Sequence, residues 1–155
     1  MFRRVGIAVA AGALALTGAA LAATPTFYQG TTSQKIDPSC TSSCTMEPFS
    51  LNVQGGKVIG VMFSAHYKGP RRCATLTNDT FGSPQLVVRH GRLSGTMRSS
   101  RYDSMKIQAT ISGGVLTGSF SSRTEFLNFR GSRLVSVGPT CRTGVIHFTA
   151  HSRAP

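Results

Sequence analysis

Hydrophobic and polar residues alternate in three segments, each centred on a two-residue turn. The turns are Gly55-Gly56, His90-Gly91 and Gly113-Gly114. Alternation with period two on both sides of such a pair is typical of a β-hairpin, because glycine readily adopts the positive φ that a tight turn requires. The pattern therefore predicts three related hairpins.

The three segments align without gaps and repeat the same apolar positions. These are Leu51, Val53, Val58 and Met62 in the first, Leu86, Val88, Leu93 and Met97 in the second, and Ala109, Ile111, Leu116 and Phe120 in the third. Each segment also has a glycine four residues after its turn: Gly60, Gly95 or Gly118. In this register Gly60 faces Leu51, Gly95 faces Leu86 and Gly118 faces Ala109. We expect these glycines at bends on the inner face, where a missing side chain permits close approach of another layer.

Shorter patterns predict further strands at residues 27–29, 126–129, 134–137 and 145–151. No stretch outside the first 23 residues carries a sustained helical period. The sequence therefore predicts one all-β domain over residues 24–155, an antiparallel β-sandwich or a small β-barrel built from glycine-turn hairpins. Residues 24–48 are polar and are expected to form a disulfide-pinned N-terminal segment.

The first 23 residues have the pattern of a cleaved secretory signal peptide. Arg3 and Arg4 precede an apolar run that closes on the small residues Ala20-Leu21-Ala22, with cleavage expected near Ala22 or Ala23. A retained membrane anchor is the alternative, but the run is rich in Ala and Gly and weakly hydrophobic for a span. We expect an exported chain, extracellular or in the cell envelope or periplasm, with no transmembrane segment after cleavage.

Four cysteines, Cys40, Cys44, Cys73 and Cys141, are expected to form disulfides in an oxidising compartment. Three pairings are possible. Cys40 with Cys44 is favoured because the two flank a short polar turn, and Cys73 with Cys141 would tie the middle of the chain to its last strand. A zinc site is the alternative, but the ligand spacing fits it poorly, and no metal or cofactor is expected.

The chain is strongly basic. Without Arg3 and Arg4, fifteen of the 17 Lys and Arg remain, against five Asp and Glu. Such a surface attracts anionic polymers or anionic surfaces, although a basic composition alone also suits an ordinary solvated surface. No specific nucleic-acid motif is present, and nothing in the sequence sets the oligomeric state.

Two clusters of cations are the candidate binding residues. On the second hairpin Arg89 and Arg92 face each other, and like charges directly opposite destabilise a sheet unless an anion binds between them. Arg98 follows on the same polar face, with Arg101 close in sequence. The second cluster is Lys68, Arg71 and Arg72, next to Tyr67. These seven residues are the predicted anion site.

No catalytic motif is recognisable. The five carboxylates form no acid/base pair motif, and there is no Gly-x-Ser-x-Gly sequence or phosphate-binding loop. His147 and His151 would share a face in a strand but lie roughly 13 Å apart there, too far to bind one metal ion. No catalytic residue is predicted.

Three motifs resemble those of uncharacterised secreted bacterial β-proteins. The segments are YQGTTSQ (28–34), FSLNVQGGKV (49–58) and CRTGVIHFTA (141–150), with Cys73 between them. That family opens with Tyr-x-Gly-x-Thr-Ser-Gln and ends in Cys-x-Ser/Thr-Gly-x-Val-x-aromatic-x-Ala; Phe148 stands where tryptophan is expected. The resemblance supports the Cys73–Cys141 pair and implies no established activity.

The hairpin GGVLTGSF (113–120) also resembles one hairpin of avidin-like barrels. The chain contains no tryptophan, so the aromatic walls of a biotin pocket are missing and that assignment is rejected.

Three functions remain as hypotheses. The first is a non-catalytic binding module for anionic envelope or surface polymers. The second is a barrel for a small hydrophobic ligand, lined by Phe49, Met62, Met97 and Phe120, although the favoured alternative is that these residues fill the core. The third is an enzyme inhibitor or small hydrolase.

Overall fold

The computed structural model describes residues 24–75 and 78–153, which form nine β-strands and one short 3-10 helix. The elements are β1 (Thr26–Lys35), β2 (Met46–Gln54), β3 (Lys57–Ser64), η1 (Arg71–Thr75), β4 (Asn78–Val87), β5 (Arg92–Arg98), β6 (Ser104–Ser112), β7 (Val115–Arg130), β8 (Arg133–Arg142) and β9 (Ile146–Arg153). The all-β prediction is confirmed. The predicted signal peptide, residues 1–23, lies outside the described residues, and in the part of the chain that is described no helix is long and apolar enough to cross a membrane.

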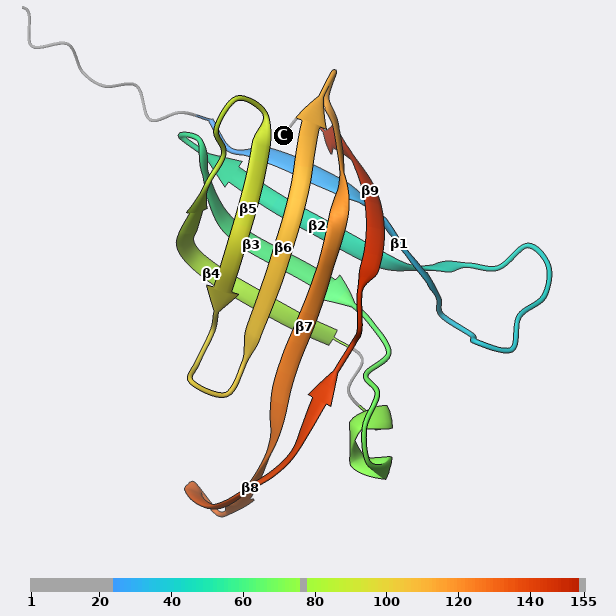
Figure 1. The fold of residues 1–155 in the computed structure, drawn as a ribbon, viewed down its shortest axis with the longest axis vertical. Helices are drawn as coiled ribbons and strands as arrows, with labels where there is room; N and C mark the ends of the chain where they lie inside the picture. The colour runs from blue at the N-terminus through green and yellow to red at the C-terminus, as the bar shows by residue number, and fades with distance from the viewer. Residues whose placement is uncertain (1–23, 76–77, 154–155) are drawn as a thin grey trace, which may run out of the picture.

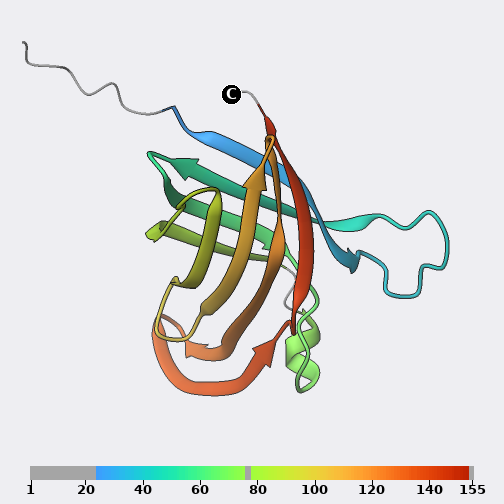
Figure 2. The same cartoon turned by 45° about the horizontal axis from the view of Figure 1, so that its top comes forward.

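All strands pair antiparallel in one sheet of order β4-β3-β2-β1-β9-β7-β6-β5, with β8 paired to β7. β4 and β5 are consecutive in the chain but stand at opposite ends of this order. The sheet therefore rolls on itself, and Figures 1 and 2 show β1–β4 crossing behind β5–β7. The ends meet at the His90-Gly91 turn, where Arg89 N donates to Arg92 O (2.8 Å) and Arg92 N donates to Arg89 O (2.9 Å).

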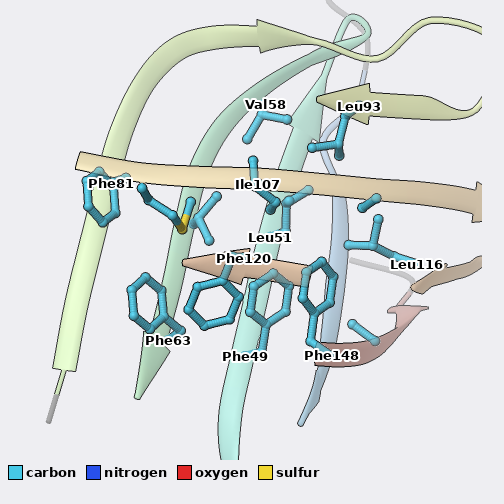
Figure 3. Close-up of a cluster of buried hydrophobic side chains, with 14 of the residues drawn as sticks. Phe49, Leu51, Val58, Phe63, Phe81, Leu93, Ile107, Leu116, Phe120 and Phe148 are labelled. Atoms are coloured by element: carbon cyan, nitrogen blue, oxygen red, sulfur yellow. The ribbon is translucent and has the colours of Figure 1, made fainter. Parts of the chain in front are cut away.

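Phenylalanine fills the space between the two halves of the sheet (Figure 3). Phe49 stacks on Phe148 with ring centroids 4.0 Å apart, and Phe63 lies 4.4 Å from Phe120. Phe81 joins them from β4, so the cluster draws on both halves of the sheet. Stacked and tilted aromatic pairs add about 0.5–1.5 kcal/mol each to the hydrophobic gain of burial, and this cluster holds the layers together.

Three of the four residues considered as the lining of a ligand cavity belong to this packed core. Phe49, Met97 and Phe120 are buried, whereas Met62 is 58% exposed on the outer surface. The reason is a β-bulge. Val53 pairs with Val58 but Asn52 pairs with Gly60, so Ile59 is an extra residue in β3. One added residue moves every later side chain of the strand to the other face.

Because of the same bulge, Gly60 does not lie where the sequence predicts it. Leu51 lies opposite Val61, not Gly60, and Gly60 lies opposite Asn52. A Cβ added at Gly60 would meet nothing nearer than 3.9 Å, so this position is not a close approach. Gly118 lies opposite Ala109, as predicted. Among the described residues β4 and β5 pair only through the Arg89–Arg92 bridge, so Gly95 is not paired with Leu86 in a ladder, but a Cβ added at Gly95 would lie 2.5 Å from the Leu86 side chain.

Both favoured disulfides are present, Cys40–Cys44 and Cys73–Cys141. The first closes the loop between β1 and β2, which projects from the sheet in Figure 1. The second is fully buried beside Tyr67 and fastens η1 to the end of β8. The first strand is longer than predicted, since β1 spans Thr26–Lys35. The strands expected at 126–129, 134–137 and 145–151 lie within β7, within β8 and mostly within β9.

Candidate functional site

The seven predicted site residues do not form one cluster. Arg89 and Arg92 face each other at the β4–β5 turn, as predicted from the sequence. Arg98 lies at the other end of β5, six residues or roughly 20 Å further along the strand. Lys68 precedes η1 and forms a bridge to Arg142 at the end of β8. Arg89 and Arg92 are therefore separate from the second cluster, whereas Arg98 lies at the end of the sheet that carries Lys68.

Two of the predicted residues are engaged within the protein. The Arg72 guanidinium donates to Asn128 Oδ1 at 2.7 Å and lies 5.6 Å from the centre of the Phe126 ring. Arg101 stacks over Tyr102 at 4.6 Å and donates a hydrogen bond to its hydroxyl. Both arginines are exposed, but these contacts fix the η1 and β5–β6 regions.

A row of cations crosses the sheet at the end that carries η1 and β8. Arg98 lies opposite Ser104, Ser104 opposite Arg123, Arg123 opposite Arg142, and Arg142 opposite Lys68. Directly opposed residues point to the same face of a sheet, and neighbouring strands are about 4.8 Å apart. Arg98, Arg123, Arg142 and Lys68, here called the cationic row, thus present four positive charges over roughly 19 Å.

A groove of about 470 Å³ runs beside this row. Its lining is Thr96, Ser104, Lys106, Ser121, Ser122, Arg123, Arg142, Gly144 and Val145. Lys106 lies two positions from Ser104 on β6, so it adds a fifth cation to the same face. Within residues 24–75 and 78–153, no carboxylate lies within ion-pair distance of Lys68, Lys106 or Arg142.

The carboxylates near the row already have partners in the protein. Glu125 Oε1 forms an ion pair with Arg123 at 2.6 Å. Asp103 accepts hydrogen bonds from the Ser100 hydroxyl at 2.8 Å and from the Thr124 hydroxyl. These contacts leave three of the five cations, Lys68, Lys106 and Arg142, without an acid to neutralise them. Such an arrangement is suited to an anion, because a negative charge between the cations would relieve their mutual repulsion.

Behind the groove lies the half-buried carboxylate of Asp79, and no Lys, Arg or His of the described part of the chain is within ion-pair distance of it. The Tyr67 hydroxyl donates to Asp79 Oδ2 at 2.8 Å, and Ser122 Oγ donates to the same oxygen at 3.3 Å. Burial raises the pKa of Asp79, and the nearby charge of Asp103 adds to that increase. Burial likewise raises the pKa of Tyr67, so its hydroxyl stays protonated as a donor.

The raised pKa of Asp79 makes stability depend on pH. An acid with a higher pKa in the folded state contributes stability that is fully present below its unfolded pKa and is lost as pH rises through its folded pKa. We expect urea denaturation to show this loss in the parent protein, and Asp79→Asn to reduce it because the amide is never ionised. A Glu125→Gln control removes an ion-paired carboxylate instead. An unchanged pH profile in Asp79→Asn would contradict the assignment.

Sequence reasoning missed Arg123 and Arg142. An unbroken register from the Gly131-Ser132 turn, in which Arg130 faces Arg133, would place Arg123 opposite Thr140. Register shifts between Glu125 and Leu127 and between Asn128 and Phe129 add two residues to β8, and Arg123 lies opposite Arg142 instead. A β-bulge leaves no reliable signal in one sequence.

His147 and His151 lie in β9 as expected, exposed on one face. Comparison with models of known protein families gave no match, and a search of curated proteins gave no significant relative. The resemblance to secreted bacterial β-proteins therefore stays a prediction from the quoted motifs.

Proposed function

We propose that the protein is an exported, non-catalytic binding module whose cationic row and adjoining groove engage an anionic polymer of the cell envelope or cell surface. The observation that carries this proposal is the register of Arg98, Arg123, Arg142 and Lys68 across neighbouring strands. Cations spaced by one or two strand separations can contact anionic groups along an extended chain. The two disulfides and the leader pattern support an oxidising compartment.

The outer face beyond the row supports a polymer that also offers hydroxyl groups. Its side chains are mostly hydroxyls and amides that lie opposite one another across β5, β6, β7 and β9. The residues are Ser94, Gln108, Ser119 and His147 in one line, and Arg92, Thr110, Thr117 and Thr149 in the next. A second, shallow groove is lined by these positions. Such donors and acceptors suit an acidic polysaccharide better than a bare chain of charges.

The test compares two variants that each remove three positive charges. Lys68→Gln, Lys106→Gln and Arg142→Gln together remove three charges from the candidate site, whereas Lys57→Gln, Arg89→Gln and Arg153→Gln remove the same charge at the other end of the sheet, outside both grooves. All six side chains are exposed. By isothermal titration with polygalacturonate, we expect the first variant to lose about tenfold in affinity, since an exposed charge pair contributes up to about 1 kcal/mol.

The second variant is expected to retain affinity within about threefold of the parent, because it keeps the local site and loses only long-range attraction. Binding by the parent should fall steeply as salt rises, but screening weakens any basic surface, so the pair of variants decides the question. Equal losses would leave only diffuse attraction. A larger loss in the second variant would place the site at the end of the sheet that carries the β4–β5 turn, and no binding by the parent would end the proposal.

A further inference from the structure

The hairpin of β7 and β8 projects beyond the rest of the sheet, with η1 beside it (Figure 1). One of its two faces contacts η1 through a single arginine. Phe126 and Asn128, alternate residues of β7, both contact Arg72 of η1. Alternate residues of a strand share a face, so Leu127 and Phe129 point away from η1.

The uncovered face is apolar. Leu127 lies opposite Val137 and Phe129 opposite Leu134, which gathers four apolar side chains on that face. Three apolar side chains of the hairpin are strongly exposed: Phe129 by 57%, Val135 by 55% and Val137 by 44%. Single exposed apolar residues are ordinary, but a group of them on one projecting hairpin marks an interaction surface.

Cations flank this apolar group at both ends. Arg130 and Arg133 lie opposite each other at the tip and are exposed; Arg130 follows Phe126 and Asn128 on the face toward η1, so this pair borders the apolar face across the tip of the hairpin. Arg123 and Arg142 lie opposite each other at the base. The single carboxylate in residues 123–142 is Glu125, which pairs with Arg123. The surface therefore complements a partner that is negatively charged at its boundary and apolar immediately beneath it.

We propose that the β7–β8 hairpin docks on an anionic lipid surface. Phe129, Val135 and Val137 enter the boundary between headgroups and acyl chains, while Arg130 and Arg133 contact lipid phosphates. Apolar side chains beside arginine are the combination that binds such an interface, because burial of apolar area and attraction to anionic headgroups add. This surface shares Arg123 and Arg142 with the cationic row, but its apolar residues and the tip arginines Arg130 and Arg133 lie outside that row.

A tryptophan reporter tests insertion directly. The protein has no tryptophan, so Phe129→Trp introduces a single fluorophore at the proposed contact, and Met62→Trp introduces one at an exposed position elsewhere. With vesicles of phosphatidylcholine and phosphatidylglycerol, we expect a blue shift and quenching by brominated acyl chains in Phe129→Trp alone. No shift, or equal shifts in both proteins, would overturn the proposal.

Vesicle sedimentation of the otherwise unmodified chain provides the second measurement. Phe129→Ser, Val135→Ser and Val137→Ser together should weaken binding to these vesicles at least about tenfold, and Phe27→Ser, Met62→Ser and Val87→Ser should leave it nearly unchanged. Arg130→Gln with Arg133→Gln should weaken it less and remove its preference over pure phosphatidylcholine. Equal binding by the two serine variants would refute lipid docking.

The outcome is separable from that of the polymer proposal. The Phe129, Val135 and Val137 variant keeps all five cations of the polymer site, so it should still bind polygalacturonate. If light scattering shows that the parent self-associates without vesicles and this variant does not, the hairpin is an interface between copies of the chain and lipid docking is wrong.

Discussion

Replacing Cys73 and Cys141 together by alanine is expected to lower the free energy of unfolding by about 4 kcal/mol, because the cross-link between them spans 68 residues. A long cross-link removes much of the conformational entropy of the unfolded chain. Both sulfurs are also buried, so the variant leaves space beside Tyr67. Urea denaturation monitored by circular dichroism measures the loss.

The matched control replaces Cys40 and Cys44, which lie four residues apart in the chain. The same entropy relation gives about 2 kcal/mol for so short a loop, and the projecting β1–β2 loop should loosen without disturbing the core. Peptide mapping without reduction verifies the parent pairing first. A loss for Cys40 and Cys44 as large as that for Cys73 and Cys141 would contradict the role assigned to the buried bridge.

The buried disulfide also positions part of the candidate site. Lys68 bridges to Arg142, the residue after Cys141, through two backbone hydrogen bonds of 2.7 and 3.0 Å. Cys73 is five residues beyond Lys68, so the cross-link keeps both partners near each other. We therefore expect the Cys73 and Cys141 variant to bind polygalacturonate more weakly than the parent, even at temperatures where it remains folded.

Gly118→Val is expected to destabilise the fold by about 3 kcal/mol, at the upper end of the usual cost of overpacking. A Cβ at Gly118 would lie 2.2 Å from the backbone oxygen of Gln108 and 2.6 Å from the Ala109 Cβ. These atoms belong to β6, the paired strand. The neighbouring strand cannot yield without breaking its own hydrogen bonds, so β6 and β7 would have to separate.

Two controls accompany this substitution in thermal and urea denaturation. Thr117→Val changes an exposed residue of the same strand and should alter stability little. Gly60→Val places the same side chain at a glycine whose added Cβ would find no atom nearer than 3.9 Å, so we expect a clearly smaller loss there. Similar losses for Gly60→Val and Gly118→Val would show that the bulge at Ile59 is misplaced.

The hairpins show how far local sequence determines this fold. Around Gly113-Gly114 the predicted register holds along β6 and β7 from Ser112 and Val115 to Ala109 and Gly118. Both turn glycines have positive φ, 55° and 78°. Turn conformation and alternation act over a few residues, and both can be read directly from the chain.

Around Gly55-Gly56 the same reasoning succeeds at the turn and fails three residues later. Gln54 lies opposite Lys57 and Val53 opposite Val58, as predicted, and then Ile59 enters as an extra residue. The bulge forms where β3 pairs with both β2 and β4, and no pattern of neighbouring residues in the sequence predicts it. Met62 is exposed for this reason alone.

The residues of the candidate binding site also fall into two groups, those that the sequence predicts and those that only the tertiary structure brings together. Sequence by itself determined the three turns, the all-β class, the excess of positive charge and the facing pair Arg89 and Arg92, because each depends on composition or on neighbours close in the chain. Only the tertiary structure decided that Arg98, Arg123, Arg142 and Lys68 stand in one row. That row depends on pairings between strands distant in sequence, on two register shifts in β8 and on a disulfide across 68 residues. Such contacts follow from the packing of the whole sheet, so no segment of the chain specifies them alone.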